Sequence, residues 1–183
     1  ARIAETASAQ AAVTALRLEG VAPSVAQRKA ILQSLLAPFG SLGSLDEPVS
    51  RTLWRAIRDV TPFAAAGPAA NRDLWRISTA PAQGAGLAAA LARATDLELV
   101  YDWAGGLIWA ALPASDDAHA PLVHAAAANH GGHATLIRAP AAVRAKVDVF
   151  TAEEPVLAAL SKRVRDGFDP HGVLNPGRMW AGV

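Results

Sequence analysis

The order of strand and helix patterns most constrains the fold of this chain of 183 residues. Alternating apolar and polar residues predict a strand, whereas apolar residues three and four apart predict a helix. By these patterns we expect strands at 13–18, near 44–47, and at 74–78, 97–103, 107–112 and 134–138. The predicted helices lie at 23–39, 52–60, 86–94, 121–128 and 151–168, with a loop at 61–70.

This order predicts an α+β fold, in which an antiparallel sheet carries helices packed on one face. The arrangement is ferredoxin-like, in a single or a duplicated form, and no internal repeat is obvious. Ala104-Gly105-Gly106 is typical of a hairpin between two of the strands. Capping boxes are expected where Ser24 precedes Gln27 and where Thr151 precedes Glu154. The expected core residues are Leu16, Leu18, Ile31, Leu35, Leu74, Ile77, Leu99, Leu136 and Leu160.

Composition excludes several classes of protein. Apolar residues make up 52% of the chain, and its net charge of +1 is close to balance. This composition does not suggest a nucleic-acid-binding surface, which needs clustered Lys and Arg on one face. The absence of cysteine excludes disulfides, thiolate metal sites and iron–sulfur ligation by this chain. No apolar run is long enough to predict a transmembrane helix, and no signal peptide is recognised. We therefore expect one domain over residues 1–183.

Two segments combine glycines with aromatic or basic residues. In Asp102–Trp109, a glycine pair lies between Trp103 and Trp109, which suits the approach of a flat ligand. In Gly131–Arg138, two glycines precede His133 at the start of a predicted strand. The alternative interpretations are an ordinary hairpin and a hydrogen-bonded structural histidine.

Two further patterns bear on binding chemistry. Trp75 and Arg76 are adjacent on a strand and point to opposite faces, so that Arg76 faces either a pocket, where it could bind a carboxylate, or solvent. His119, His124, His130 and His133 match no usual zinc spacing. We therefore expect no metal site.

The tail Phe168–Met179 is rich in turn-forming residues. Pro170 should end the preceding helix, and Gly172 and Gly177 permit positive φ angles. Asn175-Pro176-Gly177 has the composition of a turn. Either a surface coil or an ordered segment at a binding site would explain this composition.

Taken in chain order, these segments resemble a known family. They are Leu16–Gly20, Leu74–Arg76, Asp102–Trp109, Gly131–Leu136 and Phe168–Met179. Together they resemble the FAD-binding subunits of bacterial glycolate oxidases, which are FAD-linked oxidases of the vanillyl-alcohol-oxidase type. In such oxidases the tail is laid against the flavin.

The resemblance implies that residues 1–183 form the C-terminal, cap-like domain of such a subunit, without its N-terminal FAD-binding domain. The cofactor is then FAD, which this chain alone should not retain. It also implies a cytoplasmic complex with a catalytic flavoprotein subunit and an iron–sulfur subunit, with peripheral attachment to the inner membrane through these partners as an alternative. The expected flavin contacts are Asn175, Pro176, Gly177, Arg178 and Trp103, and the candidates for the substrate pocket are Trp75, Arg76, Trp109 and His133.

One departure from related proteins affects the expected chemistry. The catalytic sister subunits carry a GHxGDGNxH motif and a GEHG motif in the regions of Asp102–Trp109 and His133, and this chain has neither. The metal-assisted hydroxy-acid site of these sisters is therefore not expected here, and a flavin-carrying, electron-relaying or structural subunit is favoured over an independent dehydrogenase. The alternatives are the cap of a free-standing FAD-dependent oxidoreductase and a non-catalytic module that docks partners.

Overall fold

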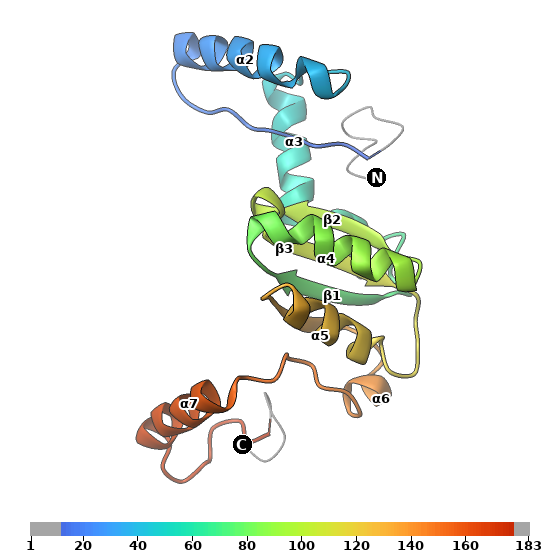
Figure 1. Cartoon of the computed structure of the whole chain (residues 1–183), viewed down its shortest axis with the longest axis vertical. Coiled ribbons are helices and arrows are strands. Elements are labelled where there is room, and N and C mark those ends of the chain that lie inside the picture. Colours follow the sequence, from blue (N-terminus) through green and yellow to red (C-terminus); the bar gives the residue numbers. More distant parts are fainter. Residues whose placement is uncertain (1–11, 178–183) are drawn as a thin grey trace. The chain divides into compact units, whose positions relative to one another are not determined.

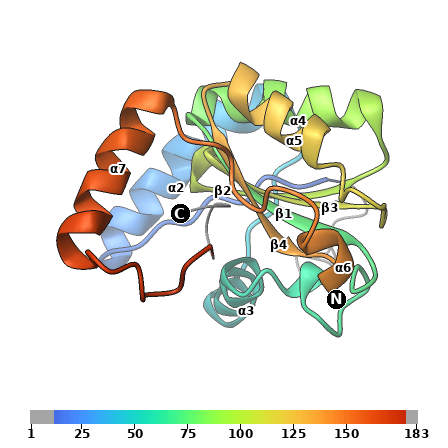
Figure 2. The same ribbon diagram turned by 90° about the horizontal axis from the view of Figure 1, so that it is seen from below.

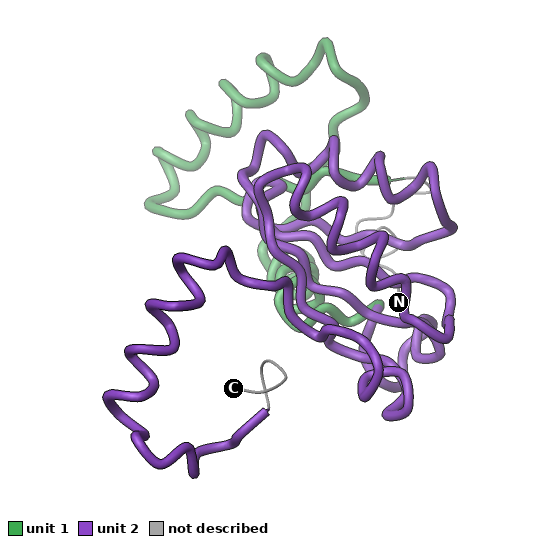
Figure 3. Tube along the Cα trace, turned by 60° about the horizontal axis from the view of Figure 1, so that its bottom comes forward, with its two compact units in different colours: residues 1–62 green, residues 63–183 purple. Residues whose placement is uncertain are grey.

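The computed structural model describes residues 12–177. The chain divides after Pro62 into two compact units, residues 1–62 and 63–183 (Figure 3).

The first unit consists of two helices and their connections. Helix α2 spans Ala22–Leu36 and is followed by a 3₁₀ turn at Ala37–Phe39. Helix α3 spans Glu47–Arg58, and the 3₁₀ turn at Thr61–Phe63 crosses the boundary to the second unit. Asp46 caps α3 by accepting a hydrogen bond from the Val49 N–H (3.0 Å).

Three expectations for this unit are wrong. Residues 13–18 and 44–46 form no strand, and Glu47 already belongs to α3. A strand needs a neighbour for its backbone hydrogen bonds, whereas Asp46-Glu47-Pro48 is a helix-start sequence. Ser24 does not cap α2, because the helix begins one turn earlier, after Val21.

The second unit contains a four-stranded antiparallel sheet. Its elements are β1 (Asp73–Ser78), α4 (Pro81–Ala94), β2 (Glu98–Asp102), β3 (Leu107–Leu112), α5 (Ala120–Asn129) and β4 (His133–Arg138). The strand order is β2-β3-β1-β4, and every neighbouring pair is antiparallel. This is the ferredoxin-like order, so the predicted fold class is confirmed. Residues 12–177 contain one copy of it.

Helices α4 and α5 lie together on one face of the sheet (Figure 1), and Figure 2 shows this layering from the side. Between the layers is the core of the unit. From the sheet it takes Trp75, Ile77, Ile108, Leu112 and Leu136, and from the helices Leu87, Leu91 and Val123. The sheet residues in this set alternate along their strands, as expected for a sheet with one face against helices.

The expected core residues are only partly correct. Leu74, Ile77 and Leu136 are buried, and Leu99 packs against the core. Leu35, by contrast, is 63% exposed, and no residue of α2 is buried. Leu16, Ile31 and Leu160 are also exposed, because an apolar stripe is buried only where another element covers it.

The last part of the unit follows β4. Residues Val149 and Thr151 hydrogen-bond to Leu136 and Ala134 at the edge of β4 (2.8 and 3.1 Å). The short helix α6 (Ala141–Arg144) precedes them, and α7 (Pro155–Phe168) follows. The capping box expected at Thr151 is wrong, because the Thr151 hydroxyl accepts the Ala134 N–H instead (2.8 Å).

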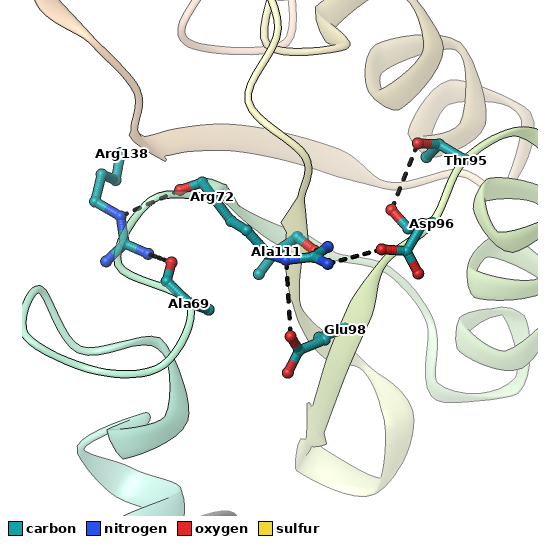
Figure 4. Close-up of polar contacts among 7 residues, drawn as sticks. All are labelled: Ala69, Arg72, Thr95, Asp96, Glu98, Ala111 and Arg138. Carbon is teal, nitrogen blue, oxygen red and sulfur yellow. Dashed lines mark hydrogen bonds and ion pairs between the residues drawn. The ribbon is translucent and has the colours of Figure 1, made fainter.

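Two arginines fix the loop before β1 to the sheet (Figure 4). Arg138 donates to the backbone carbonyls of Phe63 (2.7 Å), Ala69 (2.6 Å) and Arg72 (3.3 Å). The Arg72 guanidinium in turn donates to the Asp96 carboxylate (2.7 Å). The loop expected at 61–70 is therefore ordered by hydrogen bonds from β4.

Over residues 12–177, no helix combines the length and the hydropathy needed to span a bilayer.

Candidate functional site

The two glycine-containing segments meet at one end of the sheet. Ser78, the last residue of β1, pairs with Leu107 on one side and with His133 on the other, and Leu107 pairs with Asp102 of β2. The next residue, Thr79, donates its N–H to the Gly106 carbonyl (2.9 Å) and its hydroxyl to the His130 carbonyl (2.7 Å). The end of β1 thus holds both segments side by side.

Glycine is required where α4 meets the hairpin. A Cβ added to Gly84 of α4 would collide with the carbonyl oxygen of Gly105. Gly105 itself has a φ of +96°, which side-chain-bearing residues rarely adopt. The 3₁₀ turn at Trp103–Gly105 therefore packs directly against α4, and this contact fixes the backbone position of Trp103.

Trp103 is the exposed aromatic residue of this hairpin. Its side chain is 59% exposed, and its backbone has a φ of +52°. The Asp102 carboxylate holds this conformation by accepting the Trp103 N–H (2.7 Å). Non-glycine residues with positive φ cost free energy and are concentrated at functional sites.

Arg76 lies against Trp103 on the sheet face that α4 and α5 do not cover. The centre of its guanidinium is 5.8 Å from the centroid of the Trp103 ring, within cation–π range. In the sheet register, Arg76 is paired with Trp109 on β3 and with Thr135 on β4. Paired residues share a face, so Arg76, Trp103 and Trp109 form a basic and aromatic cluster, which we call the sheet-face cluster.

The structure separates Trp75 from this cluster. Trp75 points to the opposite face, as its alternation with Arg76 predicts, and it is 0% exposed. Its indole N–H donates to the Ala118 carbonyl (2.8 Å), and its ring meets His124 edge to face. A fully buried core side chain cannot line a substrate pocket. His133 lies exposed at the start of β4, in the same sheet row as Asp102.

The tail forms a turn organised by Asp169. The carboxylate of Asp169 accepts the N–H groups of Val173 (3.0 Å) and Leu174 (2.7 Å). These hydrogen bonds lower the pKa of Asp169. Helix α7 ends at Phe168, as Pro170 predicts, and Gly172 and Gly177 have positive φ.

Asn175, Pro176 and Gly177 follow this turn and are exposed, and Asn175 has a φ of +48°. Arg178 lies outside the described residues. Among residues 12–177, the hydrogen bonds of the tail lie within it or run to α7, and none joins it to the sheet-face cluster.

Sequence reasoning missed two carboxylates. Asp169 could have been found, because Asp commonly bonds backbone N–H groups a few residues ahead in a turn. Asp73 could not, because its hydrogen-bond partner, the Ser115 N–H (3.1 Å), is distant in sequence. Burial raises the pKa of Asp73, which is 1% exposed at the start of β1.

Within the described residues, no group of three or more histidines and carboxylates is placed to hold a metal ion. The expected absence of a metal site stays a prediction.

The comparison with known proteins bears on these observations. Over 146 residues, 74% of this chain, the sequence is 32% identical to glycolate oxidase subunit GlcE of Escherichia coli strain K12. The resemblance to the glycolate oxidase E subunit is confirmed. The chain covers 33% of the length of GlcE, in its C-terminal part. No protein-family profile and no solved structure matches the chain.

Acidification should release the tail turn. The pKa of Asp169 is lowered in the folded chain, so the ionised carboxylate stabilises the turn fully above the ordinary Asp pKa of about 3.9. This stabilisation of the turn is lost as the pH falls through the lower pKa of the folded state. Amide hydrogen-exchange protection factors of Val173 and Leu174, measured against pH, should fall in that window.

Asp169→Ala should abolish the protection at every pH. The matched control is Asp166→Ala, which removes an α7 carboxylate that pairs with Lys162 and does not bond the tail. Protection that persists in Asp169→Ala would show that another group orders the turn.

Proposed function

We propose that this chain is the C-terminal, cap-like part of an FAD-linked oxidase subunit, which covers the flavin in a glycolate-oxidase-like complex and supports oxidation of a 2-hydroxy acid. The observation that carries the proposal is the similarity to GlcE over 146 residues. The ferredoxin-like sheet and the position of the Trp103 hairpin at its end are consistent with a covering role.

The residues present are suited to one side of a flavin. An exposed indole at Trp103, backed by the cation of Arg76, offers a flat surface and a positive charge. Asn175 offers an amide in an exposed turn whose conformation Asp169 maintains. The chain contains no glycine-rich phosphate-binding motif, so the pyrophosphate of FAD would be held elsewhere in the subunit.

When bound, a flavin accepts a hydride equivalent and passes on electrons singly or in pairs. The residues of this chain would position and shield it. Within this proposal, Trp103, Asn175, Pro176, Gly177 and Arg178 contact the flavin. Arg76, Trp109 and His133 lie toward the substrate.

Partner subunits are part of the proposal. The chain has no cysteine, so iron–sulfur centres that receive electrons would have to be ligated by another subunit. We propose a catalytic flavoprotein subunit and an iron–sulfur subunit as the partners.

The proposal is tested by FAD affinity. The chain should be prepared together with the coding sequence that precedes Ala1 in frame, and FAD dissociation constants measured by flavin fluorescence. Trp103→Ala should weaken binding about 2–12-fold, the equivalent of losing an aromatic contact of about 0.5–1.5 kcal/mol. Asn175→Ala should have an effect of similar size, from one neutral hydrogen bond.

The matched control is Phe39→Ala, which removes an exposed aromatic side chain in the first unit. Trp103→Phe, which keeps an aromatic face, should retain most of the affinity. Equal FAD affinity in all four variants would reject the assigned contacts. A lengthened chain that binds no FAD at all would favour the partner-docking alternative, and one that oxidises substrate without other subunits would favour a free-standing oxidoreductase.

A further inference from the structure

An arginine-lined groove lies on the first unit. It is lined by Arg17, Arg51, Trp54, Arg55 and Arg58, and we call it the arginine groove. Four of these come from α3, and Arg17 comes from the segment before α2. The centre of the Arg17 guanidinium is 5.9 Å from the centroid of the Trp54 ring, so the two segments meet in the groove.

The amphipathic pattern of α3 explains how the groove arises. Leu53 and Ile57 are buried, whereas Arg51, Arg55 and Arg58 follow each other at spacings of four and three residues. Such spacing places the three cations on one helix face, along about 10 Å of helix. The helix thus buries one face and presents a row of guanidiniums on another.

The helix macrodipole alone does not account for the four arginines of the groove. Cations in the last turn are favoured by the helix macrodipole, which explains Arg55 and Arg58. It does not explain Arg51, which forms a helix-stabilising i,i+4 pair with Glu47, or Arg17, which is not in the helix. The convergence of all four on one hollow beside an indole is a separate property of the surface.

The contacts already made in the groove identify the chemistry that it accepts. Arg17 pairs with Glu19, Arg51 with Glu47 (2.5 Å) and Arg58 with Asp59, whose two carboxylate oxygens accept two hydrogen bonds. These pairs are exposed, and exposed pairs contribute little stability, so an incoming carboxylate can replace them at small cost. Among residues 12–177, no direct ion pair joins Arg55 to a carboxylate, although the Asp59 carboxylate that pairs with Arg58 also feels the Arg55 charge.

We propose that the arginine groove docks an acidic segment of a partner polypeptide, through clustered carboxylates on the arginines and packing against Trp54. Arg and Trp are the residue types that most often carry binding energy at protein interfaces. Guanidiniums bind carboxylates through two parallel hydrogen bonds, as Arg58 already does with Asp59. The proposal does not depend on flavin binding.

The test uses the whole chain and a short oligoglutamate peptide as the probe. Binding measured by isothermal titration calorimetry should be saturable at low salt and should weaken as salt is added. Arg55→Glu and Arg51→Glu should each weaken it by about fivefold, the upper range for one exposed ion pair. Arg55→Gln, which removes the charge without reversing it, should have a smaller effect in the same direction.

The matched control is Arg93→Glu, which makes the same charge change at an exposed position on α4. Equal weakening in Arg93→Glu would mean that net charge, not the groove, attracts the peptide, and would overturn the proposal. An oligolysine peptide that binds as well as oligoglutamate would also overturn it. The proposal would also be overturned if inorganic phosphate displaced the peptide at an equal concentration of negative charge. The groove would then be a site for small anions.

Discussion

Replacing Trp75 by alanine should lower the free energy of unfolding of the second unit by about 3–5 kcal/mol. The indole is fully buried between the sheet and the helices, so its loss leaves a cavity in the core. It also leaves the Ala118 carbonyl without its N–H donor. Chemical denaturation followed by circular dichroism gives the value directly.

Two variants separate the causes of this loss. Trp75→Phe keeps an aromatic ring but removes the indole N–H, and should cost about 1–3 kcal/mol for the unpaired carbonyl. Trp103→Ala removes the same residue type from the surface and should change stability by less than about 0.5 kcal/mol. If Trp75→Ala were equally mild, Trp75 would have to line a surface after all.

Replacing Gly84 by alanine should destabilise the second unit by about 1–3 kcal/mol, although alanine is the better helix former. The added methyl group would collide with the Gly105 carbonyl, which is backbone and cannot rotate away. Helix α4 and the Trp103 hairpin must then separate. Thermal denaturation measures the loss, and a changed tryptophan fluorescence spectrum should accompany it.

Gly167→Ala in α7 provides the matched control, because a Cβ there would meet open space. That change should stabilise its helix by about 0.5–1 kcal/mol. The two glycine substitutions should therefore have opposite signs. A stabilising Gly84→Ala would show that α4 and the hairpin are not in close contact.

The sequence alone determined the order of the strands and of helices α4, α5 and α7 in the second unit, but it did not predict the short helix α6. The alternating pattern of β1 placed Trp75 and Arg76 on opposite faces, and the glycine pair predicted the hairpin that follows Trp103. Pro170 predicted the end of α7. These features depend on residues that are close together in the chain, through side-chain periodicity and backbone torsion preferences.

Only the tertiary structure decided which of the apolar patterns in the sequence form strands and which apolar side chains are buried. The alternation at 13–18 forms no strand, since a strand is stabilised by hydrogen bonds to a partner that this segment lacks. Leu35 and Leu87 both occupy apolar stripes of helices, yet Leu35 is exposed and Leu87 is in the core. Burial depends on which element lies opposite, and periodicity carries no information about that element.

The candidate site shows the same division. Sequence singled out Asp102–Trp109 and Gly131–Arg138 by their composition, but their meeting at the end of β1 depends on Thr79 and on the strand order. The contact of Arg76 with Trp103 likewise needs a positive φ at Trp103. The Asp102 carboxylate maintains this conformation by its hydrogen bond, and so does the close packing of Gly105 against Gly84. The sequence determined which residue types were present. Which of them act together depends on the distances between segments that are remote in the chain, and hydrogen bonding and close packing set those distances.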